Sequence, residues 1–333
     1  MSILVTGAAG FIGANFVRLL ATKTTEPIIA LDALTYAGNR ENLAGLNNEQ
    51  VLFSHTSICD QEDLATVFDT HNVQQVVHFA AESHVDRSIL SSDPFIQTNV
   101  VGTQRLLDVC RKFNVTRFVH VSTDEVYGSL SKTDPAFTES HQIQPNSPYS
   151  ASKASSDLLV RSYVETFGFP AMITRCSNNY GPYQFPEKLI PLMIHHARTG
   201  KSLPVYGDGQ NIRDWVHVSD HCDAVLAVLN QGKVGEVYNI GGECELTNLS
   251  IVESIIDAVG ASRDLIQFVT DRPGHDFRYA MNIQKITNDL GWQPQVTFKQ
   301  GLADTIQWYQ NNDAWLQRVI SGEYQDYMKE QYQ

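Results

Sequence analysis

Tyr149 and Lys153 stand four residues apart, in a segment that follows Pro148 and has the composition of a helix. Residues at this spacing lie on one face of a helix, one turn from each other. An ammonium group beside a phenol favours the tyrosinate. We therefore expect Lys153 to lower the pKa of Tyr149, so that Tyr149 can act as a base for a hydroxyl group. A packed tyrosine beside a surface lysine would have the same spacing.

Two adjacent carboxyl groups, Asp124 and Glu125, follow Thr123 at the end of an apolar run. Like charges held close together raise the pKa of one carboxyl group, so one group can serve as an acid and the other as a base. An elimination reaction needs both. Because successive residues of a strand point to opposite faces, joint action requires the strand to end by Thr123. A solvated acidic loop, or Asp124 as a cap, is the alternative.

Gly7, Gly10 and Gly13 have the spacing G-x-x-G-x-x-G, directly after an apolar strand and at the start of a helix. Such glycines allow a tight turn and a close approach of the backbone to a pyrophosphate, to which the helix N-terminus offers donors. Asp32 ends the next predicted strand, where its carboxylate can accept hydrogen bonds from ribose hydroxyls and repel a 2′-phosphate. The pattern predicts NAD rather than NADP. Alternatively, Asp32 caps the turn before Leu34.

A fold must bring these residues together. The first half of the chain alternates short apolar runs with amphipathic stretches. The alternation predicts an α/β fold, a Rossmann-like doubly wound parallel sheet with helices on both faces. After about residue 179, prolines and glycines break the rhythm, which predicts a smaller mixed α/β lobe that binds the substrate. We divide the chain into 1–178 and 179–333, and 212–230 could return to the first lobe. The predicted strands are Ile3–Thr6, Ile28–Asp32, Val51–Ser54, Val76–Ala80, Phe118–Ser122 and Ala171–Cys176, and the predicted helices are Phe11–Ala21, Gln61–Asp69, Pro94–Phe113, Tyr149–Phe167, Leu249–Val259 and Gly301–Asn311.

The 333 residues carry a net charge of −13, which disfavours nucleic acid as a partner because that binding needs a basic surface. No apolar stretch approaches the ~20 residues of a membrane span. The five cysteines are far apart and odd in number, a pattern of free thiols in a reducing cytoplasm. We expect a cytoplasmic enzyme without a metal, because His195, His196, His217 and His221 lack further ligands at suitable spacing.

Taken together, these motifs resemble the extended short-chain dehydrogenase/reductase family over nearly the whole chain. Within it, five blocks are similar, in the same order, to the blocks of the dTDP-glucose 4,6-dehydratase family. The resemblance implies an NAD-dependent hydro-lyase that converts dTDP-glucose to dTDP-4-keto-6-deoxyglucose and water, by transient oxidation at C4, elimination across C5 and C6, and hydride return to C6. The blocks are HFAAESHVDRSI (His78–Ile89), STDEVYG (Ser122–Gly128), SPYSASKASSD (Ser147–Asp157), NNYGPYQFPEKLIP (Asn178–Pro191) and DRPGHDFRYA (Asp271–Ala280).

The resemblance also implies a role for each matching residue. Tyr149 would be the base for the sugar 4-hydroxyl group, and Thr123 would bind the same oxygen. Glu125 would take the C5 proton, Asp124 would protonate the departing 6-hydroxyl group, and Lys153 would complete the catalytic set. The implied NAD contacts are Gly7, Gly10, Phe11, Ile12, Gly13, Asp32, Leu34, Thr35, Ser57, Ile58, Ala80, Ala81, Ser83, Thr98, Tyr149, Lys153 and Asn178. The implied contacts with the nucleotide sugar are His84, Thr123, Asn178, Glu187, Lys188, Leu189, Pro204, Tyr206, Arg213, Asn248, Asp271, Arg272 and His275.

Ser57 departs from the family pattern, because members usually carry an aspartate there to meet the adenine amino group. A serine hydroxyl can still accept that hydrogen bond, but it is neutral and shorter, so we expect a weaker adenine contact. The resemblance further implies a homodimer held by the helices 94–113 and 149–167, although these helices could instead pack only within one chain.

Three alternative functions remain from the sequence. A UDP-sugar 4-epimerase needs no acid pair, and a UDP-glucuronate decarboxylase typically has serine at the position of Asp124. A non-catalytic NAD-sensing regulator would usually lose the pair that Tyr149 and Lys153 form. Asp124 therefore favours dehydration, while the choice of thymidine over uridine rests on resemblance alone.

Overall fold

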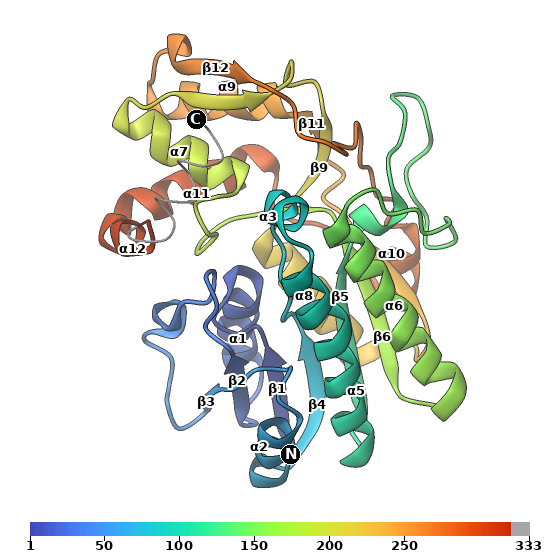
Figure 1. The fold of residues 1–333 in the computed structure, drawn as a ribbon. Helices are drawn as coiled ribbons and strands as arrows, with labels where there is room; N and C mark the ends of the chain where they lie inside the picture. Colours follow the sequence, from blue (N-terminus) through green and yellow to red (C-terminus); the bar gives the residue numbers. More distant parts are fainter. Residues whose placement is uncertain (321–333) are drawn as a thin grey trace.

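The computed structural model describes residues 1–320, so residues 321–333 of the predicted second lobe lie outside the described part. A large sheet holds seven parallel strands in the order β10-β6-β5-β4-β1-β2-β3 (Figure 1), which confirms the predicted doubly wound fold. Its strands are β1 (Ser2–Thr6), β2 (Ile28–Asp32), β3 (Val51–His55), β4 (Val73–His78), β5 (Arg117–Thr123), β6 (Ala171–Cys176) and β10 (Val237–Ile240).

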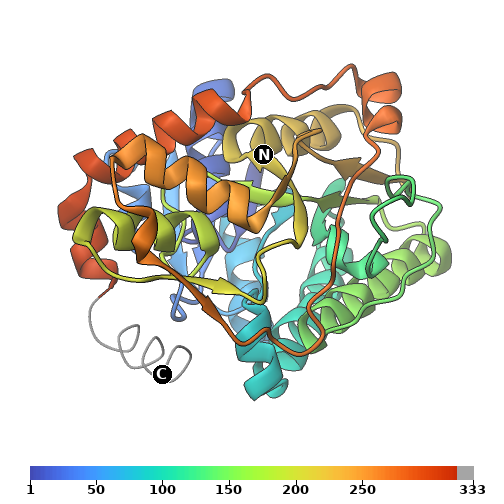
Figure 2. The same ribbon diagram turned by 90° about the horizontal axis from the view of Figure 1, so that it is seen from above.

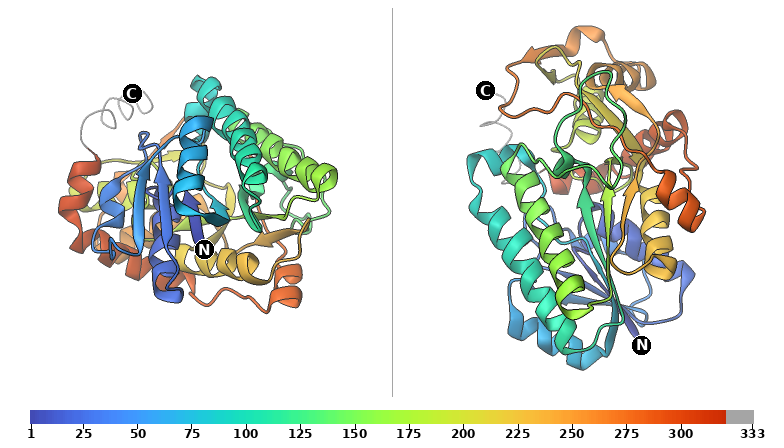
Figure 3. Two further views of the ribbon diagram at one scale, coloured as in Figure 1. Left: turned by 90° about the horizontal axis from the view of Figure 1, so that it is seen from below. Right: turned by 90° about the vertical axis from the view of Figure 1, so that its right-hand side faces the viewer.

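Helices cover and bury both faces of this sheet (Figure 3). Because both faces are buried, the sequences of its central strands are continuously apolar and do not alternate between apolar and polar residues. On one face, Phe16 and Leu20 of one helix pack with Val228 of another. On the other face, Leu64, Leu107 and Val160 come from three different helices. The first face carries α1 (Phe11–Lys23) and α8 (Val218–Gln231), and the second carries α2 (Gln61–His71), α5 (Thr103–Lys112) and α6 (Pro148–Phe167).

The second lobe lies over the carboxyl ends of the strands (Figures 1 and 2). Its helices enclose a separate apolar core that includes Tyr180, Ile194, Trp215 and Ile255. Two small sheets support it, one in the order β11-β9-β7 and one that pairs β12 with β8. Its elements are β7 (Asn178–Tyr180), α7 (Leu189–Thr199), β8 (Leu203–Tyr206), β9 (Ile212–His217), β11 (Glu245–Thr247), α9 (Asn248–Val259), η4 (Arg263–Leu265), β12 (Ile266–Val269), α11 (Phe298–Asn311) and α12 (Asp313–Val319), while α10 (Gln284–Leu290) packs near α8 and β10.

The segment 212–230 divides between the two lobes. Its strand, β9, belongs to a small sheet of the second lobe, whereas its helix, α8, packs against α1 and the large sheet. Strand β10 was not predicted from the sequence, because its four residues are too few to show a periodic pattern. We retain the boundary at residue 178 as a proposal, with 218–240 attached to the first lobe.

Two predicted elements were wrong in detail. The run 94–113 is not one α-helix: α4 (Asp93–Phe95) leads into a π-helical turn, η2 (Ile96–Gly102), before α5 begins. Asn99 in that turn is buried, and its amide exchanges hydrogen bonds of 2.9 Å with both backbone groups of Glu82. Strand β4 also ends at His78 instead of Ala80, and the turn at Gly7, which follows the neighbouring strand β1, lies against the Ala80 backbone.

Within residues 1–320 no helix has the length and apolar character to cross a membrane. The five cysteines are free thiols. In the same range no group of three or more His, Cys, Asp and Glu side chains could hold a metal ion.

A buried polar network ties the strands together beneath the carboxyl edge of the sheet. Asp157 on α6 accepts a hydrogen bond of 2.9 Å from Nε of Arg175 on β6, and His120 on β5 lies 3.4 Å from its other oxygen. Arg175 also donates to the Tyr127 hydroxyl, which donates in turn to Asn239 on β10. Although burial would raise the pKa of Asp157, hydrogen bonding with His120 and the charge of Arg175 hold it below its usual range. The network thereby links α6, three strands of the large sheet and the turn that holds Tyr127.

We predict that Arg175→Met lowers the free energy of unfolding by about 3 kcal/mol, because it leaves the Asp157 carboxylate buried without its ionic partner. Urea unfolding at pH 7 measures this loss. The control is Arg161→Met on the same helix as Asp157, since Arg161 forms only an exposed ion pair of 3.7 Å with Glu165. That variant should lose less than about 0.5 kcal/mol. Equal losses in both variants would contradict the prediction.

Candidate active site

A cleft of about 330 Å³ lies at the carboxyl ends of the parallel strands, within the size range of small-molecule sites. This edge is where open α/β sheets bind their ligands. Residues that follow β1, β2, β3, β4, β5 and β6 line it, together with the segment 176–188. The cleft therefore collects side chains from both lobes.

The glycine turn after β1 forms the floor of the cleft. Gly7 has a φ of +67°, and a Cβ there would lie 2.7 Å from the backbone nitrogen of Ala80. A Cβ on Gly13 would collide with the carbonyl oxygen of Gly7. Helix α1 begins after Gly10 without a side-chain cap in the described chain, which leaves its first N–H groups for an anion. The turn has the shape and donors of a pyrophosphate site.

Asp32 performs the turn-capping role that the sequence left open, and it also faces the cleft. Its Oδ1 accepts a hydrogen bond of 2.8 Å from Leu34 N, and its Oδ2 accepts one of 2.8 Å from Ala9 N. Burial raises the pKa of Asp32, an effect that these backbone donors oppose. Each oxygen keeps a second lone pair for a ribose hydroxyl group. The turn and the carboxylate therefore fit NAD, and the same charge disfavours a 2′-phosphate.

Most of the residues predicted to contact NAD line this cleft, with Leu34 as the exception. Leu34 takes up a left-handed backbone conformation, with φ +51°, to donate its N–H to Asp32. Sequence reasoning missed Glu82, Phe185 and Ser177, although they stand inside or beside the blocks that carry the resemblance. The predicted residues that line the cleft are Gly7, Gly10, Phe11, Ile12, Gly13, Asp32, Thr35, Ser57, Ile58, Ala80, Ala81, Ser83, Thr98, Tyr149, Lys153 and Asn178.

Strand β5 ends at Thr123, as joint action of the two acids requires. A 3-10 turn, η3 (Asp124–Tyr127), begins immediately afterwards. The Thr123 hydroxyl donates to Asp124 Oδ1 at 3.2 Å and accepts from Glu125 N at 3.2 Å. This change from strand to turn brings Thr123, Asp124 and Glu125 to the same cleft as Tyr149 and Lys153.

The prediction that Lys153 lowers the pKa of Tyr149 was wrong for this structure. Burial raises the pKa of Tyr149 well above its usual value, and the charges of Glu125 and Asp124 raise it further. Lys153 Nζ donates a 2.8 Å hydrogen bond to the Val121 carbonyl, and burial lowers the pKa of Lys153 to about 8. The spacing that predicted the pair could not reveal how deeply both side chains are buried.

The two carboxyl groups have different surroundings. Burial raises the pKa of Asp124 well above its usual value, and the charges of Glu125 and Asp214 add to this effect. The Asp124 Oδ2 atom is buried and has no hydrogen-bond partner among residues 1–320. Burial also raises the pKa of Glu125, but the charges of Arg272 and Lys188 oppose that rise. Asp124 therefore holds a proton more readily than Glu125.

Several cations predicted to meet an anionic substrate converge near the acids. Lys188 Nζ lies 2.9 Å from the Ser83 carbonyl oxygen, beside the cleft. The buried Arg213 guanidinium donates to the backbone carbonyls of Ile212, Asp276 and Phe277, and its charge acts on both Asp124 and Glu125.

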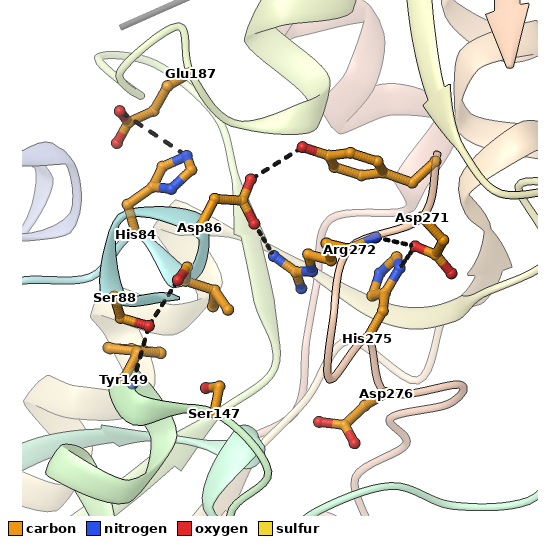
Figure 4. Close-up of polar contacts among 12 residues, drawn as sticks. His84, Asp86, Ser88, Ser147, Tyr149, Glu187, Asp271, Arg272, His275 and Asp276 are labelled. Atoms are coloured by element: carbon orange, nitrogen blue, oxygen red, sulfur yellow. Dashed lines mark hydrogen bonds and ion pairs between the residues drawn. The ribbon is translucent and has the colours of Figure 1, made fainter. Parts of the chain in front are cut away.

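Of the other predicted substrate residues, Glu187 lines the cleft, and the rest lie outside its lining. His84 is 3.9 Å from Glu187, and His275 is 2.6 Å from Asp271 (Figure 4). Burial lowers the pKa of His275 to about 4, with help from the charge of Arg272. The others that stand away from the lining are Leu189 at the start of α7, Pro204 and Tyr206 on β8, and Asn248 at the start of α9.

The parallel sheet, the glycine turn and the Tyr149–Lys153 pair define the class of extended short-chain dehydrogenases/reductases. The family described as GDP-mannose 4,6 dehydratase matches residues 4–305. A dTDP-glucose 4,6-dehydratase of Escherichia coli is 48% identical over 100% of this chain and 99% of its own length. The solved structure of DesIV, a dTDP-glucose 4,6-dehydratase from Streptomyces venezuelae with NAD bound, has a TM-score of 0.93 and 50% identity, covering 96% of this chain and 100% of that one.

An epimerase also shares the fold. The UDP-glucose 4-epimerase of Thermus thermophilus, solved as a complex with NAD, has a TM-score of 0.88 but only 28% identity, over 94% of this chain and 100% of that one. The chain belongs to the dTDP-glucose 4,6-dehydratase family.

The Ser57 position gives a test of the cofactor site. Ser57 lines the cleft, and its Oγ accepts a hydrogen bond of 3.1 Å from Cys59 N. We predict that Ser57→Asp tightens NAD binding by roughly threefold to tenfold, because an ionised acceptor forms a stronger hydrogen bond with the adenine amino group. Calorimetric titration of NAD measures the dissociation constant. Ser57→Ala, which removes the acceptor, should change it in the opposite direction, and unchanged or weaker binding in Ser57→Asp would refute the prediction.

Proposed function

We propose that this protein is an NAD-dependent hydro-lyase that converts dTDP-glucose to dTDP-4-keto-6-deoxyglucose and water. The observation that carries the proposal is the buried acid pair, Asp124 and Glu125, beside Tyr149 in the cleft. Oxidation or epimerisation alone needs a base for one hydroxyl group, and two further acids would only add desolvation cost. Incubation with dTDP-glucose and, separately, with UDP-glucose tests the function, and the absence of a 4-keto-6-deoxy product from dTDP-glucose would refute it.

When bound, NAD supplies the chemistry of a hydride acceptor at C4 of the sugar and of a hydride donor at C6. Tyr149 takes the proton of the 4-hydroxyl group, whose oxygen Thr123 also binds. The C4 ketone acidifies the C5 hydrogen, which Glu125 then removes. Asp124 donates its proton to the 6-hydroxyl group, which leaves as water. The proton held by Glu125 returns to C5 as hydride is delivered to C6.

The protonation states of Asp124 and Tyr149 support each other in this mechanism. A charged Asp124 is one of the groups that raise the pKa of Tyr149. A protonated Asp124 no longer contributes that charge, so the acid form of Asp124 favours the basic form of Tyr149. Lys153 lies one helical turn from Tyr149 and would hold the nicotinamide ribose.

The cations of the second lobe supply the site for the diphosphate. A net charge of −13 repels an anionic substrate at long range, so the positive groups must be concentrated where the substrate binds. Arg213, Arg272 and Lys188 all act on Glu125, which indicates that they lie near one another and near the reacting sugar. We retain the other predicted substrate contacts as proposals, and we place the enzyme in the cytoplasm, where NAD is available and its thiols stay reduced.

We also propose that the protein forms a homodimer through α6 and the helical run from α4 to α5. These helices lie side by side on one face of the sheet (Figures 1 and 3). Their outer surface exposes large apolar side chains, with Leu158 56%, Phe167 49% and Ile96 44% accessible. Apolar side chains that gather on a helix pair are a feature of protein–protein interfaces.

Leu158→Glu should convert such a dimer to a monomer, because it places a charge in the centre of the apolar surface. Light scattering after size-exclusion chromatography gives the mass. Phe268→Glu is the control: Phe268 is equally exposed, at 56%, but lies on β12 of the second lobe. A dimer that survives Leu158→Glu would contradict the proposed interface.

Glu125→Gln and Asp124→Asn should each reduce kcat for dehydration by about 10² or more, because each removes a proton-transfer group. Glu125→Gln should also abolish exchange of the C5 hydrogen with solvent deuterium. Asp257→Asn, which alters an exposed carboxylate of α9, is the control. Full dehydration by both site variants would refute the assignment.

The pH dependence of kcat follows from the raised pKa values of the two acids. Glu125 must be ionised, so kcat should fall as the pH drops through the raised pKa of Glu125. Asp124 must be protonated, so kcat should also fall as the pH rises through the raised pKa of Asp124. Asp124→Asn should therefore lose the alkaline limb that Asp124 contributes and keep the acidic one.

A further inference from the structure

Helix α3 (Val85–Leu90) lies between the catalytic helix and the second lobe (Figures 1 and 4). It holds a carboxylate, Asp86, that plays no part in the mechanism above. The Asp86 residue is only 7% exposed, and a carboxylate at that depth requires partners.

Both oxygens of Asp86 have partners in the second lobe. Oδ1 accepts a 2.8 Å hydrogen bond from Arg272 (Figure 4), and Oδ2 accepts a 3.1 Å hydrogen bond from the Tyr206 hydroxyl. Arg272 precedes Pro273 in an irregular segment, and Tyr206 ends β8. One buried carboxylate of the first lobe thus joins two separate elements of the second.

Arg272 keeps unused hydrogen-bonding capacity in this arrangement. Its Nε is buried and has no acceptor among residues 1–320, while the ion pair with Asp86 occupies another nitrogen of the same planar fork. A guanidinium group that is fixed by an ion pair at one nitrogen and has another N–H without an acceptor is suited to bind a phosphate oxygen. Burial would lower the pKa of Arg272, but the charge of Asp86, the hydrogen bond to it and the charge of Glu125 together raise that pKa, so Arg272 remains charged.

The other side of α3 is fixed to the catalytic helix. The Ser88 hydroxyl accepts a 3.2 Å hydrogen bond from Tyr149 N and donates to the Val85 carbonyl (Figure 4). Residues two apart in a helix project about 200° from each other. Asp86 can therefore face the second lobe while Ser88 faces α6, so α3 gives Asp86 a fixed position relative to Tyr149.

We propose that Asp86 is a positioning residue, which orients Arg272 and Tyr206 to receive the diphosphate of the nucleotide sugar. The inference rests on the proposed function, because it assigns a role within that substrate site. Asp86 acts through its two partners and does not touch the reacting sugar. Asp86 stabilises the bound substrate and the transition state equally. Its loss therefore weakens substrate affinity and leaves kcat nearly unchanged.

The first experiment measures binding of dTDP to the NAD-loaded enzyme by calorimetry, and kcat and KM with dTDP-glucose. Asp86→Asn keeps the shape of the side chain and removes its charge, so we expect the Kd for dTDP and the KM to rise at least fivefold, with kcat within threefold. Asp86→Glu keeps the charge but displaces the carboxylate, and we expect a similar rise. Asp257→Asn, which disrupts the exposed pair with Arg263 at the far end of α9, should leave all three values unchanged.

A double-mutant cycle tests whether Asp86 acts through Arg272. Arg272→Gln alone should weaken dTDP binding, and adding Asp86→Asn to it should cause a smaller further loss than Asp86→Asn causes in wild type, because only the contact with Tyr206 is then left to lose. Additive losses would overturn the proposal, as would an unchanged Kd in both Asp86 variants. If wild type binds dTDP but forms no product from dTDP-glucose, the proposed function fails. If wild type is fully active and the Asp86 variants match it, only this inference fails.

Discussion

The change from strand to turn at Thr123 governs the chemistry of this molecule, because it carries two carboxyl groups into a buried cleft. Asp124 and Glu125 share that cleft with the phenol of Tyr149, so three groups that become anionic on deprotonation are desolvated together. Such an arrangement is costly unless other groups compensate for it. From below, Tyr127 anchors the same turn to Arg175 and Asn239. From above, the second lobe brings cations toward Glu125.

The two lobes therefore depend on each other more closely than a division at residue 178 suggests. Strand β10 belongs to the large sheet and helix α8 packs against it, although both follow the first elements of the second lobe in the chain. Between the lobes, Lys188 contacts the Ser83 carbonyl and Arg272 contacts Asp86. Each of these cations joins the two lobes, and in the proposed function each also favours an anionic ligand, which would allow a chain with a net charge of −13 to bind a diphosphate.

Local features of the sequence predicted much of this structure. Each of these features depends on a short stretch of chain: the glycine spacing, the Tyr149–Lys153 spacing and the apolar strands. In the structure the glycines, Tyr149 and Lys153 all lie in the cleft at one edge of the sheet. Features that depend on distant contacts were not predictable in the same way. The pKa of Tyr149 rises because of burial and two carboxylates, while the sequence displayed only the lysine one turn away. The widened turn at Asn99 depends on the backbone of Glu82, and the pairing of Asp86 with Arg272 joins residues 186 positions apart.

The charges around Asp124 and Glu125 also indicate which of the two is the acid and which is the base, without reference to any related protein. Burial raises the pKa of both acids. At Asp124 the like charges of Glu125 and Asp214 add to the rise and Arg213 opposes it, whereas at Glu125 the rise is opposed by Arg272, Lys188 and Arg213. Asp124 is thus the better proton donor and Glu125 the group that ionises first. The cations near Glu125 are the ones that a diphosphate would engage. Its negative charge would offset theirs, raise the pKa of Glu125, and so strengthen Glu125 as a base once the substrate is in place. Substrate binding and proton abstraction at C5 are in this way coupled through the same three side chains.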